Sequence, residues 1–196
     1  MTVEIFIPFW GEPALLYQTV ASVRAQTDAD WRLEVLDDCY PDTSVAQHFA
    51  DLDDPRVSYV RNHTNLGITD NYRLAISRAT TEYIVILGCA DLLHPNYLEV
   101  VRRAITLVPQ ADVVQPGVQV IDESGAVVLP LADRVKQRVL APRGGTGVAV
   151  LSGERMATSL IRGDWLYWPS LTFRTATLKR IDFRDGLPII QDLALL

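Results

Sequence analysis

Little in this sequence of 196 residues points to a membrane or to nucleic acid. No apolar run approaches the roughly 20 residues that a transmembrane helix needs, and the first residues read as a strand rather than a signal peptide. The net charge of −6, with lysine and arginine scattered along the chain, argues against a nucleic-acid partner. These absences favour a cytoplasmic protein, which would reach the inner face of a membrane only through segments outside this sequence.

Cysteine and histidine are also scarce. Cys39 and Cys89 each follow an expected strand, where reduced buried thiols are the favoured interpretation and a disulfide is the alternative. The three histidines, His48, His63 and His94, do not form a cluster. The sequence contains no Cys/His metal spacing, no nucleophile elbow and no Walker lysine. The absence of these motifs excludes a Cys/His metal site, a hydrolase site with a nucleophile elbow and a P-loop.

The apolar pattern of the first half predicts alternating strands and helices. Hydrophobic residues make up 48% of the chain, which is enough for one domain with a real core. Strands are expected at residues 3–9, 32–36, 57–61 and 83–87. Helices are expected at residues 14–26, 44–51, 69–79 and 97–108, with Thr69 as the N-cap of the third. This alternation predicts an α/β fold with a mostly parallel sheet flanked by helices.

The second half has a different rhythm. Residues 112–121 and 126–129, separated by the turn 122–125, indicate a hairpin rather than a crossover. A short helix is expected at residues 154–161 and a last strand at 171–174. The sequence ends inside the apolar pattern of a helix that begins near Ile189, which suggests a fragment of a longer protein.

Three expected strands are followed by informative residues, at Pro8–Glu12, Asp37–Asp38 and Gly88–Asp91. Ligands bind at the carboxyl ends of the strands in an open parallel sheet, so these residues should meet in one crevice. In the aspartate pair, one carboxylate could accept a donor from a base or ribose while backbone amides hold the other. A simple turn that caps the next helix is the alternative. Asp91 could hold a divalent cation against a diphosphate, or could cap its own loop.

Read together, these segments resemble the inverting family 2 glycosyltransferases, which have the GT-A fold, over nearly the whole chain. The stretch Ile5–Trp10 is similar to the family's first strand with its Pro and aromatic residue, and Ser22–Thr27 with Glu34–Asp38 is similar to the next conserved stretch. Asn65–Gly67 is similar to the family's N-x-G element. Glu82–Leu98 is similar to the segment that normally carries Asp-x-Asp-Asp and a following proline.

The resemblance implies roles for individual residues. Those expected to line the nucleotide site are Pro8, Phe9, Trp10, Glu12, Asp38, Asn65, Gly67 and Arg73. Asp38 would bind the base, through a uracil N–H, whereas the last three would lie near the pyrophosphate. Asp192 would be the general base that takes the proton of the acceptor hydroxyl, although a carboxylate at a helix N-terminus is the alternative interpretation. Trp165 and Trp168 could stack on acceptor sugar rings, unless core packing explains them.

One departure from the family stands out. Where Asp-x-Asp-Asp is usual, this chain has Gly88-Cys89-Ala90-Asp91, so alanine occupies the position of the Asp that ligates Mg²⁺ or Mn²⁺. Loss of a charged ligand should weaken binding of the metal. Asp91 or a neighbour could take over the ion, the protein could be impaired in catalysis, or Ala90 could be an introduced substitution. A smaller departure is Gln191, which stands where the family usually has Glu.

The resemblance therefore implies one GT-A domain, with a nucleotide-binding half at residues 1–111 and an acceptor-side half at 112–196. The expected enzyme moves a sugar from a nucleoside-diphosphate donor, UDP by this resemblance, to a hydroxyl acceptor with inversion, in polysaccharide or glycoconjugate biosynthesis. The alternative is a degenerate domain that binds the nucleotide sugar but cannot place the metal.

Overall fold

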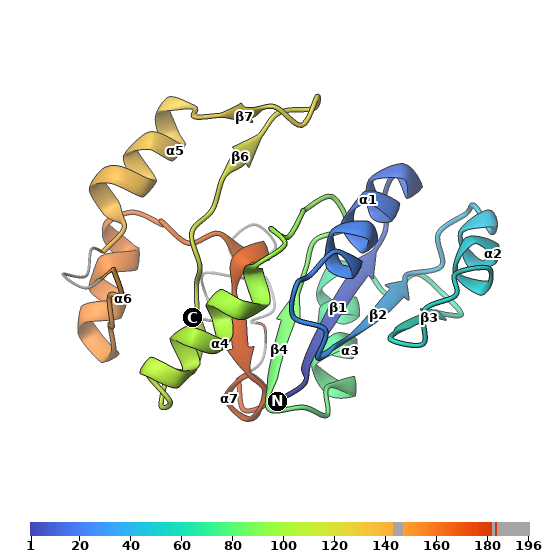
Figure 1. Cartoon of the computed structure of the whole chain (residues 1–196), viewed down its shortest axis with the longest axis horizontal. Helices are drawn as coiled ribbons and strands as arrows, with labels where there is room; N and C mark the ends of the chain where they lie inside the picture. Colours follow the sequence, from blue (N-terminus) through green and yellow to red (C-terminus); the bar gives the residue numbers. More distant parts are fainter. Residues whose placement is uncertain (143–146, 182, 184–196) are drawn as a thin grey trace. The chain divides into compact units, whose positions relative to one another are not determined.

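The computed structural model describes residues 1–142, 147–181 and 183, which divide into two compact units (Figure 1). The first unit contains Met1–Pro116 and Trp168–Phe183, and the second contains Gly117–Tyr167. The chain thus leaves the first unit after residue 116 and returns to it at residue 168. Within the described residues, no helix combines the length and the apolar character needed to cross a membrane.

A six-stranded sheet in the order β3-β2-β1-β4-β8-β5 forms the centre of the first unit. Its strands are β1 (Val3–Phe9), β2 (Trp31–Asp37), β3 (Val57–Arg61), β4 (Tyr83–Ile86), β5 (Val113–Val114) and β8 (Thr172–Arg174). The strands β1 to β4 pair in parallel, whereas β8 runs antiparallel between β4 and β5. The mostly parallel sheet predicted from the sequence is confirmed.

Helices follow the first four strands as the sequence predicted. They are α1 (Pro13–Arg24), α2 (Ser44–Ala50), α3 (Ile68–Arg78) and α4 (Tyr97–Leu107), and the short α7 (Thr175–Leu178) follows β8. The predicted N-cap of α3 at Thr69 is wrong, because the helix begins at Ile68 and Gly67 caps it. Gly67 has φ +81°, a left-handed conformation that glycine adopts without the clash that a Cβ would cause.

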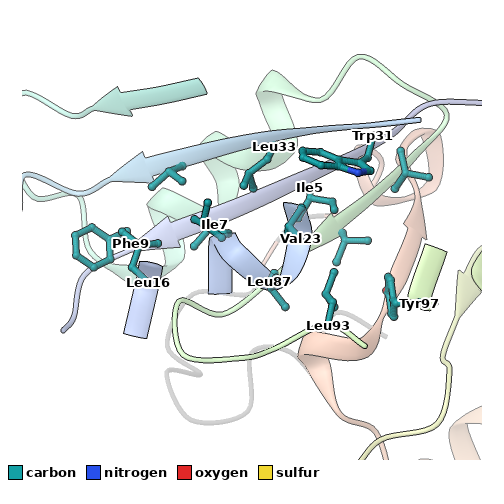
Figure 2. Close-up of a cluster of buried hydrophobic side chains, with 14 of the residues drawn as sticks. Ile5, Ile7, Phe9, Leu16, Val23, Trp31, Leu33, Leu87, Leu93 and Tyr97 are labelled. Atoms are coloured by element: carbon teal, nitrogen blue, oxygen red, sulfur yellow. The ribbon is translucent and has the colours of Figure 1, made fainter. Parts of the chain in front are cut away.

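The core of the first unit lies where β1 meets α1, β2 and α4. Ile5, Ile7 and Phe9 alternate along β1 and have no exposed surface, and Figure 2 shows them beside side chains of the neighbouring elements. Phe6, on the opposite face of the same strand, is only 3% exposed. A central parallel strand is covered on both faces, which explains why β1 is almost uniformly apolar in sequence.

The second unit is a hairpin followed by helices. It contains β6 (Val120–Ile121), β7 (Val127–Val128), α5 (Leu131–Val135), the π-helical turns η1 (Lys136–Leu140) and α6 (Gly153–Arg162). The antiparallel pairing of β6 with β7 and the helix α6 confirm two expectations from the sequence.

The single strand predicted at residues 112–121 is wrong. Its first part forms β5 in the first unit and its last part forms β6 in the second unit, with Gln115, Pro116 and Gly117 between them. Pro116 has no backbone N–H to donate to a neighbouring strand. The hydrogen bonding of a strand is therefore interrupted at this residue, and one continuous strand could not form here.

Candidate functional site

The segments that follow β1, β2 and β4 meet at one edge of the sheet, because β1 lies between the other two strands. Backbone hydrogen bonds tie these segments to the sheet. The Asp38 N–H donates to the carbonyl of Phe9 (3.0 Å), and the Leu87 N–H donates to that of Phe6 (2.9 Å). The sequence analysis predicted that these strand ends meet in one crevice. The strand order places them at the same edge of the sheet, as that prediction requires.

Asp37, the last residue of β2, is completely buried and serves the structure of this edge. Its carboxylate accepts hydrogen bonds from the hydroxyl of Tyr59, from Nη1 of Arg61 (2.8 Å) and from the N–H of Tyr40 (2.7 Å). Burial and the bond to Asp37 raise the pKa of Tyr59 to about 12. The Arg61 guanidinium also donates to the carbonyl of Tyr40 (2.6 Å), so this network fixes the loop that carries Tyr40.

Asp38 is only 2% exposed and holds the loop before α3. Its Oδ1 accepts from the N–H of Leu66 (2.8 Å) and from Nδ2 of Asn62 (2.9 Å), and its Oδ2 accepts from the N–H of Gly67 (2.9 Å). Protein donors therefore reach every carboxylate oxygen of the aspartate pair. The contact between Asp38 and a base stays a prediction, which relies on the second lone pair of Oδ2.

Two aromatic residues lie side by side at this edge. Trp10, in the loop after β1, is 51% exposed and meets the ring of Tyr40 edge to face, with centroids 5.5 Å apart. Phe9 lies on the inner side of Tyr40 (5.1 Å) and has no exposed surface, so it supports the pair from the core rather than facing a ligand. Pro8 is half-buried and Glu12 is exposed at the start of α1. The arrangement offers an aromatic surface for a planar group.

The predicted pyrophosphate residues are also engaged within the protein. Oδ1 of Asn65 accepts from the N–H of Gly67 (2.8 Å), which completes the turn before α3. The Arg73 guanidinium pairs with Asp70 (2.9 Å) and donates to the carbonyl of Phe183 (2.7 Å). A diphosphate would have to compete with these partners for Arg73, and the assignment stays a prediction.

The turn after β4 contains a carboxylate of a different kind. A Cβ on Gly88 would lie 2.2 Å from Oδ2 of Asp91, so the Asp91 carboxylate lies across the space that a side chain at position 88 would fill. Burial raises the pKa of Asp91 above its usual range. Among the described residues no donor reaches this carboxylate, and Ala90 is exposed.

The described residues at the end of β4 form at most part of a site for a divalent cation. In the described part of the chain, no three His, Cys, Asp or Glu side chains come together as a group that could hold a metal ion. Asp91 is a single carboxylate, whereas Mg²⁺ beside a diphosphate is usually held by one or two carboxylates together with phosphate oxygens, so Asp91 would supply one protein ligand. Both cysteines are free thiols, and burial raises the pKa of Cys89, so Cys89 is not poised as a thiolate ligand.

Of the remaining predicted residues, two belong to different units and one lies outside the described residues. Trp165 belongs to the second unit, where it is 7% exposed and its indole N–H donates to Ser159 (3.1 Å). Packing therefore accounts for Trp165. Trp168 belongs to the first unit and contacts the rings of Tyr72 and Phe173. Asp192 lies outside the described residues.

Sequence reasoning missed Tyr40, Asn62 and Arg61, which position the aromatic pair and Asp38. One signal was available for Arg61. The parallel pairing of β2 with β3 places Arg61 opposite Asp37, and this register follows if both strands end at the same edge of the sheet.

The fold and this edge of the sheet define an α/β protein of the GT-A class, with a mostly parallel sheet and a smaller antiparallel part. Residues 4–157 match the family described as glycosyl transferase family 2, and the chain belongs to that family. It is 31% identical over 99 residues to the putative colanic acid biosynthesis glycosyl transferase WcaA of Escherichia coli, a match that covers 50% of this chain and 36% of WcaA.

Solved structures share the fold. The crystal structure of S. aureus TarS 1–349 superposes with a TM-score of 0.71 at 18% identity and covers 100% of this chain and 54% of that one. The mannosyltransferase PcManGT from Pyrobaculum calidifontis, in complex with GDP-Man and Mn²⁺, gives a TM-score of 0.65 at 16% identity, covering 94% and 48%. This chain spans 14% to 48% of the length of the curated relatives that it matches.

Proposed function

We propose that this chain is a glycosyltransferase domain that moves a sugar from a nucleoside diphosphate, UDP in our proposal, to a hydroxyl acceptor with inversion. The observation that carries the proposal is the sheet edge at which Trp10 and Tyr40 form an aromatic surface beside the loop held by Asp38. Structures of the related-fold protein TarS have been solved with UDP and with UDP-GlcNAc, which supports a nucleotide ligand of this class.

In the proposed reaction, the acceptor oxygen attacks the anomeric carbon of the donor in one in-line step. The bond to the diphosphate oxygen breaks, the nucleoside diphosphate leaves, and Asp192 takes the acceptor proton. A well-placed base contributes roughly 10²–10⁴-fold to the rate. Residues 1–111 would bind the donor, and residues 112–196 keep their proposed role on the acceptor side.

Calorimetry with UDP tests the donor site. We expect wild-type protein to bind UDP and the Trp10→Ala variant to bind about tenfold more weakly, because stacking of a base on an aromatic ring contributes roughly 1–3 kcal/mol. Leu15→Ala is the matched control, since Leu15 is another exposed apolar residue of the same region, 42% exposed on α1. Absence of UDP binding in the wild type would refute the proposal.

A second candidate function is a degenerate domain that binds the nucleotide sugar without catalysing transfer. The observation in its favour is the end of β4, where Ala90 is exposed and, among the described residues, Asp91 belongs to no group of three or more potential metal ligands. Binding of UDP that strengthens with Mn²⁺ would favour the enzyme, and binding indifferent to Mn²⁺ would favour the degenerate domain.

The Ala90→Asp and Gly88→Asp variants refine this test. Ala90 is exposed, so a carboxylate at position 90 would not be buried, and Ala90→Asp should strengthen Mn²⁺ binding if this position is the missing ligand. A side chain at position 88 collides with Asp91, so Gly88→Asp should restore less. Equal effects of the two substitutions would show that the geometry at Asp91 does not decide metal affinity.

A further inference from the structure

The second unit contains a groove that the donor site does not use. It runs along one face of α6 and has a volume of about 500 Å³, within the range typical of ligand sites. Every residue that lines it belongs to the second unit. The groove is therefore a feature of this unit by itself.

One wall of the groove is the polar face of α6. Glu154, Thr158 and Arg162 recur every four residues along the helix, and Arg155 and Ser159 lie beside them. Arg155 and Arg162 are two helical turns apart, which separates their positions by roughly 10 Å along the axis. Among the residues that the structure describes, neither guanidinium has a hydrogen-bond or ion-pair partner, and both residues are exposed.

The opposite wall is apolar. It consists of Val139 and Leu140 from η1 and Leu151 from the segment before α6. Leu140 also packs close to Gly163, where a Cβ would lie 2.4 Å from its Cδ1. A side chain at position 163 would therefore require the Leu140 side chain to shift.

The surrounding segment is basic although the chain is acidic. Residues 131–162 contain six basic residues and only two acidic ones, Asp133 and Glu154, whereas the whole chain has a net charge of −6. The charge asymmetry favours an anionic ligand on this segment.

We propose that this groove binds an acidic glycan. Each part of the lining matches one part of such a chain: the aliphatic wall suits the C–H faces of sugar rings, and Glu154, Thr158 and Ser159 suit hydroxyl groups. Arg155 and Arg162 suit carboxylate or phosphate substituents, which guanidinium groups bind through paired hydrogen bonds. A plain polyphosphate would have no use for the aliphatic wall. That the glycan is the acceptor of transfer rests on the proposed function.

Binding of oligogalacturonate, an acidic glycan, tests the proposal by calorimetry or fluorescence anisotropy. We expect the double variant R155Q/R162Q to bind it about tenfold more weakly than wild type, because two partly exposed charge pairs are lost. The neutral glycan maltohexaose should bind weakly to both proteins. Arg134→Gln is the matched control, since Arg134 is an exposed residue of α5 that does not line the groove.

Four results would overturn the proposal: no binding of oligogalacturonate, an equal loss in Arg134→Gln, equally tight binding of inorganic polyphosphate, or binding only to phosphatidylglycerol vesicles. Circular dichroism and thermal unfolding establish that the variants are folded, and glutamine has a helix propensity close to that of arginine. UDP binding is measured on the same proteins and should be unchanged in R155Q/R162Q. Absence of UDP binding in the wild type would refute the proposed function. It would leave the proposal that the groove binds an acidic glycan unaffected.

Discussion

The ends of β2 and β4 lie at the same edge of the sheet, and both carry aspartates, yet the two carboxylate environments are opposite. At the end of β2, Asp37 and Asp38 accept protein hydrogen bonds on every oxygen. At the end of β4, Asp91 is partly buried without a donor among the described residues, and its pKa is raised. A buried carboxylate with several hydrogen bonds stabilises the fold. A partly buried carboxylate without a donor loses hydration and gains no hydrogen bond, so its burial costs free energy.

This difference separates two parts of the proposed donor site. The region around Trp10 and Tyr40 is fixed by side chains from β2 and β3 before any ligand arrives. The region around Asp91 has no comparable scaffold and no second carboxylate within a metal-binding group of described residues. The proposed nucleoside contacts therefore lie on a fixed scaffold, whereas the proposed metal contact at Asp91 does not.

Removing the carboxylate at each strand end should give the largest contrast. We expect Asp37→Ala to lower the free energy of unfolding by about 3 kcal/mol, because the substitution leaves Arg61 and Tyr59 without their buried partner. Asp91→Ala should change it by less than about 0.5 kcal/mol, or raise it, because no hydrogen bond is lost. Urea denaturation measures both values. Similar losses in the two variants would contradict the comparison, and Asp53→Ala provides an exposed control.

Glu4, at the opposite edge of the sheet, tests whether fully hydrogen-bonded carboxylates stabilise this fold in general. Burial alone would raise its pKa, but hydrogen bonds from Thr80 and Thr81 outweigh that effect and lower it below 4.5. The stabilisation is therefore present above pH 4.5 and is lost as the pH falls through the lowered value. We expect Glu4→Gln to cost about 1–2 kcal/mol at pH 7 and to flatten this acid dependence. Denaturation curves between pH 3 and pH 7, taken here as roughly the range in which carboxyl groups titrate, measure both effects. An unchanged pH dependence in the variant would show that another group is responsible.

The smallest expected effect concerns the loop that Asp38 holds. Gly67 has φ +81° and donates its N–H to Asp38, so Gly67→Ala should destabilise the protein by about 1 kcal/mol through the left-handed conformation. The same substitution should weaken UDP binding several-fold if this loop contributes to the donor site. Gly125→Ala, at φ +80° in the turn between β6 and β7, supplies a matched strain control that should leave UDP binding unchanged. Equal UDP affinities in wild type and Gly67→Ala would separate the loop from the site.

Sequence patterns predicted the elements whose signal is local. The uninterrupted apolar run at β4 and the alternation of strands with helices up to α4 follow from burial on both faces of a parallel sheet. The hairpin of β6 and β7 followed from its turn, in which Asp122 accepts from the N–H groups of Ser124 and Ala126. Turn formation and the burial pattern of a strand depend on residues that are close in sequence, so both can be predicted from the sequence.

The partners of the aspartates could not be read in this way. Asp38 finds its donors 24 to 29 residues further along the chain, at Asn62, Leu66 and Gly67, and only the assembled loops bring them together. The helical stretch 131–140 was missed although Leu131, Val135 and Val139 recur at helical spacing. The break between β5 and β6 was missed as well, although it could have been predicted because Pro116–Gly117 interrupts the apolar run.

The place of β8 in the sheet has a consequence for how the protein is made. This strand lies between β4 and β5, so β5 has no partner in the sheet until residues 172–174 have been synthesised. The second unit is produced in that interval. On the ribosome, the first four strands would keep an open edge on β4 until β8 is made. Closure of this edge joins segments far apart in sequence, the kind of contact that forms slowly. Completion of the six-stranded sheet therefore requires that residues 117–167 have already been synthesised.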